Sequence, residues 1–497
     1  MNRFYKIVLL FISCSLTFNI AVAQNPDIKR TNYWYFGEGA GLDFSIGTPI
    51  ADINSNLHTI ESSAVISDTF GNLLFYTDGD TVWNKNHIPM PNGTGLSGCD
   101  GIWLNSSTQG ALIVPQPNSN NIYYIFTVDC VEDSGGIKGM NYTIVDMNLN
   151  GGFGDVTSKN NLLFTPSTEK LAAVHHCNKQ DVWIVSHARD SNAYAPPGKF
   201  YAYLLTNAGI NLTPVISLVG AAMSGSHGMG GVMKFSPDGS KLMCVNYTYD
   251  SIFYNYPLEL FDFDNATGII SNPMGLSNEI YLYGGSFSPD GSKIYVSNYL
   301  SYYSEVFQYD ISSGNQATII ASKTVINNVD SLKWCHQMQN APDGKLYIAR
   351  WNDANADSLA VIQNPNNTSC NFLFNGVALQ GKVVNFGLPN FVESYFNADT
   401  SSIPCNVGIE ESGKPNSVNI YPNPFNISTT IFINENSLNF FATLEIYDLL
   451  GRFIISKQIS FEEGKFILNR GNLSNGIFLL KIKYQNKTIT QKIVLTN

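Results

Sequence analysis

Cysteine and histidine residues form the densest group with catalytic potential in this chain. His175, His176 and Cys177 are consecutive, and Asp181 and His187 follow closely. A cysteine thiol beside an imidazole base can act as a nucleophile. The same residues, however, stand where a hairpin turn between two strands is expected, and turn residues are polar because they contact water. A solvated turn is therefore the favoured interpretation, with a Cys–His nucleophile as the alternative.

A segment of alternating polar residues suggests one metal site. Asp353, Asn355 and Asp357 have the spacing of a calcium loop, in which alternate side chains turn toward one cation. The next residue is Ser358 instead of glycine, and position twelve is Asn364 instead of glutamate. No cofactor is expected other than this calcium ion, and a solvated loop between strands is the favoured alternative.

A repeated hairpin organises the large central part of the chain. Pro-Asp-Gly occurs at 237–239, 289–291 and 342–344, and apolar runs flank each copy. Proline presets φ, aspartate tolerates the turn and glycine supplies positive φ, so each copy predicts a tight turn between strands. Divergent copies lie at 66–75, 115–124 and 175–185. The units begin near residues 63, 110, 171, 231, 284 and 336, and their spacing of 47 to 61 residues is typical of propeller blades with four strands each.

These hairpins resemble the turn between the first two strands of WD-repeat-like and translocation-protein-B-like propellers. The predicted fold is all-β, with a β-propeller of about seven blades. Residues 33–44 and 388–396 remain outside the six units. We expect them to form a composite seventh blade, made from both ends of the domain, which would close the ring and remove exposed sheet edges.

Four residues are candidates for a ligand site in the axial funnel of the propeller. His227 and His336 each stand near the start of an inner strand, and such starts line the axial channel. With His187 and Arg350 they would face one funnel. The favoured alternative is that the histidines are hydrogen-bonded core residues.

The N-terminal residues predict a secretory signal peptide. Arg3 and Lys6 precede an apolar run over 7–20, and Ala21-Val22-Ala23 forms a cleavage site before Gln24. The run is shorter than the ~18 residues that span a bilayer. A lipoprotein modified at Cys14 is a disfavoured alternative, because apolar sequence continues past that residue. No integral membrane segment is expected in the mature chain.

Three separated motifs mark the C-terminal segment. They are Tyr421-Pro422-Asn423-Pro424, then Asp448 with Gly451-Arg452, then Gly476 before an apolar strand. Together and in this order they resemble the type A C-terminal sorting domain of the type IX secretion system. The resemblance implies that the type IX machinery is a partner. It also implies a secreted or outer cell-surface location, reached through the periplasm.

The expected organisation has four parts: a signal peptide (1–23), a β-propeller (24–398), a linker (399–415) and a sorting domain (416–497). Alternating apolar and polar residues predict a small antiparallel β-sandwich for the sorting domain. The whole chain carries −11, residues 413–497 carry +4 and the signal peptide +2, which leaves −17 for residues 25–412. Such an acidic domain repels phosphate backbones, so no nucleic-acid partner is expected.

The cysteines predict disulfides, because an exported protein meets an oxidising environment. Cys99 could pair with Cys130, and Cys370 with Cys405, whereas Cys244 stands in an apolar strand and is expected to be a buried free thiol.

The favoured function is a non-enzymatic binding module for a glycan or a protein partner. Tyrosine-rich loops at 247–256 and 299–303 could supply stacking platforms, with ordinary core packing as the alternative. The alternative function is a hydrolase or lyase acting on extracellular polysaccharide. Two acidic groups ~5–10 Å apart in the funnel would favour that alternative.

Overall fold

The structure is a computed structural model. It describes residues 25–99, 105–191, 197–224, 228–248, 256–299, 304–327, 334–351, 356–397, 418–433, 439–448, 452–484 and 487–496. The chain forms two compact units, residues 1–405 and residues 406–497. Within the described residues, no helix is long and apolar enough to cross a membrane.

Seven antiparallel sheets follow one another along the described part of the first unit. We call them blades 1 to 7. Blade 1 contains β1 (Tyr33–Phe36), β2 (Ala40–Asp43) and β3 (Ile50–Ala51), and blade 2 contains β4 (Ala64–Ser67), β5 (Leu73–Thr77) and β6 (Val82–Asn84). Blade 3 contains β7 (Ala111–Pro115), β8 (Ile122–Val128), β9 (Met140–Asp146) and β10 (Asp155–Phe164). Blade 4 contains β11 (Ser167–His175), β12 (Val182–Ala188), β13 (Lys199–Thr206), β14 (Gly209–Ile210) and β15 (Val215–Leu218).

The remaining three blades have four strands each. Blade 5 contains β16 (Met233–Phe235), β17 (Lys241–Val245), β18 (Leu258–Asp264) and β19 (Ile269–Ser277). Blade 6 contains β20 (Leu282–Phe287), β21 (Lys293–Asn298), β22 (Val306–Asp310) and β23 (Thr324–Val325). Blade 7 contains β24 (Trp334–Asn340), β25 (Leu346–Trp351), β26 (Ser358–Ile362) and β27 (Phe372–Ala378). Short helices α1 (Val131–Ser134), α2 (Gln316–Ala321), η1 (Pro26–Thr31), η2 (Asn150–Gly152) and η3 (Glu393–Phe396) complete the unit.

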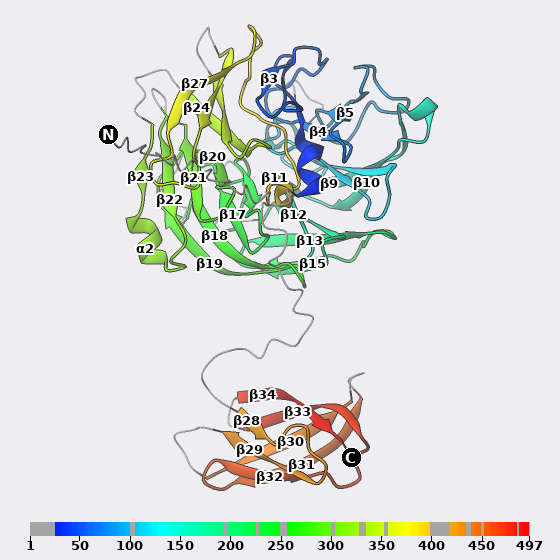
Figure 1. Cartoon of the computed structure of the whole chain (residues 1–497), viewed down its shortest axis with the longest axis vertical. Coiled ribbons are helices and arrows are strands. Elements are labelled where there is room, and N and C mark those ends of the chain that lie inside the picture. Colours follow the sequence, from blue (N-terminus) through cyan, green and yellow to red (C-terminus); the bar gives the residue numbers. More distant parts are fainter. Residues whose placement is uncertain are drawn as a thin grey trace, which may run out of the picture. The chain divides into compact units, whose positions relative to one another are not determined.

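The blades are arranged as a propeller. The first strands of successive blades contact one another, in the pairs β4–β7, β7–β11, β11–β16, β16–β20 and β20–β24, so these strands form the inner ring. Blade 1 packs on blade 7 through Trp34, Phe36 and Tyr347. Figure 1 shows the sheets grouped around a common centre. The predicted all-β propeller of about seven blades is confirmed.

The Pro-Asp-Gly segments form the predicted turns. Gly239, between β16 and β17, has φ +73°, and its N–H donates to the Ser236 carbonyl at 2.8 Å. Asp238 Oδ1 accepts from the Ser240 N–H at 3.0 Å. Asp290 and Gly291 make the same turn between β20 and β21. The local sequence therefore determines these hairpins without help from distant residues.

The propeller axis is filled by protein. One filling segment, which we call the strap, comprises residues 383–396 and ends in η3. Its Val392 forms an isolated parallel bridge with Ala173 of β11. Helix η1 packs against η3, so the first and last described residues of the unit meet at one end of the axis (Figure 1, dark blue and gold).

The prediction of a composite seventh blade is wrong, because residues 388–396 form no strand in the sheet of blade 1. All three strands of blade 1 come from residues 33–51, and the C-terminal segment does not join their sheet. Near its start, the strap hydrogen-bonds to the turn between β1 and β2, where the Glu38 N–H donates to the Val383 carbonyl at 2.9 Å. Further along, it contacts blade 1 by side-chain packing, as between Phe391 and Trp34. The physical reason is that the strap leaves the sheet edge and turns into the axis to bury Phe391, Val392 and Tyr395.

The second unit is a two-sheet antiparallel sandwich, as predicted. One sheet has the order β28 (Val418–Tyr421), β29 (Ser428–Ile433) and β32 (Lys465–Asn469). The other has the order β31 (Phe453–Phe461), β30 (Phe440–Tyr447), β33 (Gly476–Tyr484) and β34 (Lys487–Leu495). Its core includes Ile431, Leu444, Leu480 and Ile493.

Candidate functional site

Aromatic rings gather at the end of the axis where the inner strands begin. We call them the aromatic cluster; its members are Tyr247, Tyr281, Tyr283, Tyr299, Trp334, His336, Trp351 and Phe386. They come from the ends of strands in blades 5, 6 and 7 and from the strap. Ring centroids lie 4.3 Å apart for His336–Phe386, 4.8 Å for Trp351–Phe386 and 5.5 Å for Tyr283–His336. Three blades and the strap thus contribute rings to one apolar surface.

The cluster is only partly covered. His336 is fully buried at its centre, while Tyr247, Tyr281, Tyr299, Trp351 and Phe386 are half-buried. The π face of such a ring can stack on the apolar face of a ligand while the polar Tyr oxygen remains near water.

Two carboxylates lie beside the aromatic cluster. Glu61 precedes β4 and accepts a short hydrogen bond from the Tyr283 hydroxyl. Glu169 lies on β11, and its Oε2 accepts from the Thr108 hydroxyl at 2.7 Å and from the Thr108 N–H at 3.0 Å. Its Oε1 accepts from the Val131 N–H at 2.8 Å. Glu61 and Glu169 are 5% and 1% exposed, so both acids are inside the protein.

Burial changes the charge of this acid pair. Loss of hydration raises the pKa of Glu61 to about 8. The pKa of Glu169 is raised well above its usual value, by burial first and then by the negative charges of Glu132 and Glu61. Both acids therefore hold their protons to a higher pH than an exposed glutamate does, and a protonated carboxyl can donate a hydrogen bond. The buried surroundings of these two acids are similar to those of a general acid. However, Tyr283 already donates a hydrogen bond to Glu61, and Thr108 and Val131 donate to Glu169.

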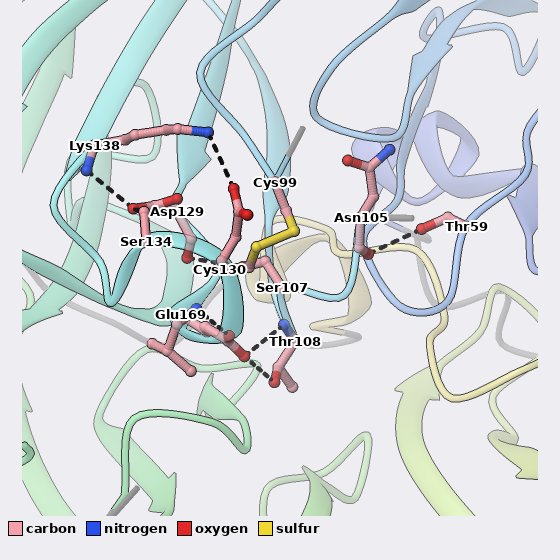
Figure 2. The surroundings of a disulfide bond; sticks show 12 residues. Thr59, Cys99, Asn105, Ser107, Thr108, Asp129, Cys130, Ser134, Lys138 and Glu169 are labelled. Carbon is pink, nitrogen blue, oxygen red and sulfur yellow. Dashed lines mark hydrogen bonds and ion pairs between the residues drawn. A yellow bond between two sulfur atoms is a disulfide. The ribbon is translucent and has the colours of Figure 1, made fainter. Parts of the chain in front are cut away.

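A loop held by a disulfide completes this end of the axis. Cys99 and Cys130 are bonded, which confirms the predicted pair. Figure 2 shows the disulfide beside the segment that begins at Asn105, with Thr108 reaching Glu169. The Asn105 carbonyl accepts from the Thr59 hydroxyl at 3.1 Å. The loop is therefore fixed by Thr59 before blade 2, by Cys130 after β8 of blade 3 and by Glu169 of blade 4.

Among the described residues, several buried polar atoms of this region have no hydrogen-bond partner. They include both ring nitrogens of His336, Oε2 of Glu61 and Oδ1 of Asn105. Burial lowers the pKa of His336 to about 3, so its ring is neutral, with one N–H donor and one acceptor. Unpaired buried polar atoms are costly unless a water or a ligand satisfies them. This set needs partners that both donate and accept, as hydroxyl groups do.

The predicted funnel residues do not form one site. His336 lies at the axis, but His187 is in β12, the second strand of blade 4, where its Nδ1 lies 2.6 Å from the Ala188 carbonyl and its ring packs on Phe200. Arg350 donates to Ser358 and to Asn375 at 2.7 Å, and it stacks on Phe374. Its guanidinium thus points toward the outer strands of blade 7. His227 lies outside the described residues.

The His175–Cys177 group is not a nucleophile with its base. Cys177 is disulfide-bonded and so has no free thiol. The Asn178 N–H donates to Nδ1 of His176 at 3.0 Å, and the Asn178 amide donates to Asp181 at 2.7 Å. These contacts stabilise the turn, which supports the favoured interpretation.

Two cavities open at the hairpin-turn end of the axis, beside η1 and η3. One of ≈ 290 Å³ is lined by residues that include His175, His176 and Asp238. The other, of ≈ 620 Å³, is lined by residues that include Phe44, Asp343 and Phe396. The first cavity is lined by two carboxylates, but Asp27 pairs with Arg30, and Asp238 accepts hydrogen bonds from Ser236 and Ser240. Among the described residues, neither cavity contains a buried histidine without a hydrogen-bond partner, so the aromatic cluster is the stronger candidate site.

The calcium prediction is untested. Asp353 and Asn355 lie outside the described residues, and only Asp357 of the three is described. Within the described part of the chain, no group of three or more His, Cys, Asp or Glu side chains could hold a metal ion.

The structure tests two further predictions about cysteines. Cys244 is a buried free thiol, as expected. Cys370 is also free and buried, so its predicted pairing with Cys405 is wrong. Cys370 packs with Tyr295 and Leu346 in the core shared by blades 6 and 7, where its sulfur serves as a small apolar group.

The motif residues of the second unit have structural roles. Asn423 bridges the opening motif to β34, donating to the Lys492 carbonyl at 2.8 Å and accepting from the Val494 N–H at 2.7 Å. Arg452 and Asp448 form an ion pair at 2.6 Å. Tyr421 is 77% exposed, and Gly451 lies outside the described residues.

Comparison with known proteins identifies the second unit. Residues 419–496 match the family described as the secretion system C-terminal sorting domain. This domain directs export by type IX secretion to the cell surface or the extracellular space. Among curated proteins, none matches the chain.

Solved structures similar to the chain have low identity. Hydrazine synthase of Kuenenia stuttgartiensis is 10% identical, with a TM-score of 0.37, covering 74% of this chain and 88% of its own. TolB of Acinetobacter baumannii is 13% identical, with a TM-score of 0.29, covering 69% and 65%. An engineered GH43 glycoside hydrolase is 7% identical, with a TM-score of 0.29, covering 78% and 90%. Likeness at this level carries no argument about function.

Proposed function

We propose that this protein is an exported β-propeller that binds a glycan, without converting it, at the aromatic cluster. One observation carries the proposal. Half-buried aromatic rings from three blades and the strap surround the buried His336 and form one stacking surface at the end of the axis. A sugar offers an apolar C–H face that stacks on such rings and hydroxyls that can hydrogen-bond to the tyrosine oxygens.

A hydrolase is the second candidate, because Glu61 and Glu169 are two buried acids in the same region of the axis. The negative charge of Glu61 contributes to the raised pKa of Glu169. A raised carboxyl pKa suits a general acid. Binding is preferred because Tyr283, Thr108 and Val131 already engage these acids, and because neither acid is more than 5% exposed.

A glycan array with the full mature chain tests the proposal. We expect selective binding that weakens about fivefold in Trp351→Ala, the loss expected from one aromatic stacking contact of ~1 kcal/mol. Phe70→Ala is the matched control, because Phe70 is 81% exposed at a distant hairpin turn. Absence of binding to any glycan would refute the proposal and direct attention to a protein partner.

Incubation of a bound polysaccharide with the protein separates binding from hydrolysis. Release of shorter oligosaccharides by the wild type, abolished in Glu169→Gln, would establish the hydrolase. Binding with no new reducing ends, even after long incubation, would establish the binding module.

A further inference from the structure

The strap, residues 383–396, contacts blades that the sequence separates widely. At its start, the Phe386 N–H donates to the Ile60 carbonyl at 3.0 Å, and the Phe386 carbonyl accepts from the Gln337 N–H at 3.3 Å. Ile60 precedes blade 2, and Gln337 lies in blade 7. The strap therefore passes between the last blade and the first ones as it enters the axis.

The middle of the strap is fixed to inner strands by its own side chains. The Asn390 amide donates to the Leu171 carbonyl in blade 4 at 2.8 Å, and its N–H donates to the Ser63 carbonyl at 3.0 Å. Leu388 and Phe391 belong to the apolar core that joins blade 1 to blade 7. The junction between these two blades is thus partly made of strap residues.

A buried ion pair anchors the end of the strap. Glu393 Oε1 lies 2.5 Å from Nζ of Lys234 in blade 5, and their side chains are 1% and 5% exposed. Gln339 of blade 7 accepts a second hydrogen bond from Lys234. Because a buried charge without its partner is strongly unfavourable, Lys234 holds the strap in one position.

The far end of the strap meets the start of the mature domain. The His175 N–H donates to the Ser394 hydroxyl at 2.9 Å, and the Asn25 amide donates to the Ser394 carbonyl at 2.9 Å. Helix η1 and blades 1, 2, 4, 5 and 7 therefore contact the strap, and blade 6 contacts it through the rings of Tyr283 and Phe386.

We infer that the strap is the ring-closing element of the propeller and that it couples ring closure to the aromatic cluster. Every blade is a separate sheet, so neighbouring blades meet through side chains, and between blades 1 and 7 the strap supplies part of that contact. Phe386 of the strap is also the ring in closest contact with His336. The seven sheets consequently form a closed propeller with a complete cluster only when the strap is in place.

Hydrogen exchange on the full mature chain tests this inference. In Glu393→Ala, we expect exchange at least tenfold faster in β1–β3 and β24–β27, while β7–β10 stays protected. Asn390→Ala, which keeps the ion pair, should give the same pattern with a smaller effect. Lys293→Met is the matched control, because it breaks the Lys293–Asp310 pair in blade 6 and leaves the strap intact. Equal acceleration in all blades, or no acceleration at blades 1 and 7 in either variant, would overturn the inference.

Discussion

Replacement of Glu61 by glutamine should change how stability depends on pH. Burial raises the pKa of Glu61 from 4.5 to about 8, so the folded state disfavours the ionised carboxylate that the unfolded chain forms freely. The stability associated with the protonated acid is fully present below pH ~4.5 and is lost as pH rises to about 8. Glutamine has nearly the same shape and cannot ionise.

The magnitude follows from the size of the pKa change. At 1.36 kcal/mol per pKa unit, the shift corresponds to a ceiling of about 5 kcal/mol between pH 4.5 and pH 8. Relaxation and water penetration reduce such penalties, so we expect a gain of about 2–3 kcal/mol for the variant relative to wild type over this range. Part of the gain comes from Glu169, whose pKa falls when the neighbouring acid is removed.

Urea unfolding of both proteins between pH 5 and pH 8 measures the difference. The comparison between variant and wild type is needed because other groups also titrate. Burial raises the pKa of Asp78 to about 6 and that of Glu259 to about 7, and it lowers the pKa of His187 to about 3. A constant difference at every pH, or a variant that loses stability relative to wild type as pH rises, would refute the reasoning.

Three further predictions concern other parts of the chain. Replacing both Cys99 and Cys130 by serine should lower the stability of the propeller by about 3 kcal/mol, measured by urea unfolding, because the bond closes a loop of 31 residues. Asp290→Ala should cost about 1 kcal/mol in the same assay, because it removes the acceptor for the Ser292 N–H in the hairpin turn; no change would show that the turn needs only its glycine. Deletion of residues 413–497 should leave the protein in the periplasm, seen by fractionation and immunoblotting, and secretion of the truncated chain would contradict the role of the sorting domain.

Local features of the fold were predictable from the residues themselves. The Pro-Asp-Gly turns at 237–239 and 289–291 form as expected, because proline and glycine restrict or permit φ within the turn itself. The pairing of Cys99 with Cys130 was also accessible, since both stand in polar loops close together in sequence. Alternation of apolar and polar residues predicted the sandwich of the second unit for the same local reason.

The candidate site was predictable only in part. The tyrosine-rich loops at 247 and 299 indicated stacking surfaces, and His336 was placed near the axis. Glu61 and Glu169 were not recognised, because each stands alone in a run of ordinary strand residues with no motif around it. His187 and Arg350 do not join His336 in one site. The direction of each side chain depends on which strand of the blade carries it and on which face of that strand it lies, and the sequence did not specify either.

By itself, the sequence determined the repeat, the turn geometry and the sorting motifs, all of which depend on residues close together in the chain. Only the tertiary structure brought Tyr283 to Glu61 across 222 residues, and only it placed the strap in the axis instead of in a composite blade. The physical reason is that closing a ring brings the starts of all inner strands to one place, and this convergence depends on the packing of whole blades. Burial at that place then changes the protonation of Glu61 and Glu169, which no property of the isolated residues specifies.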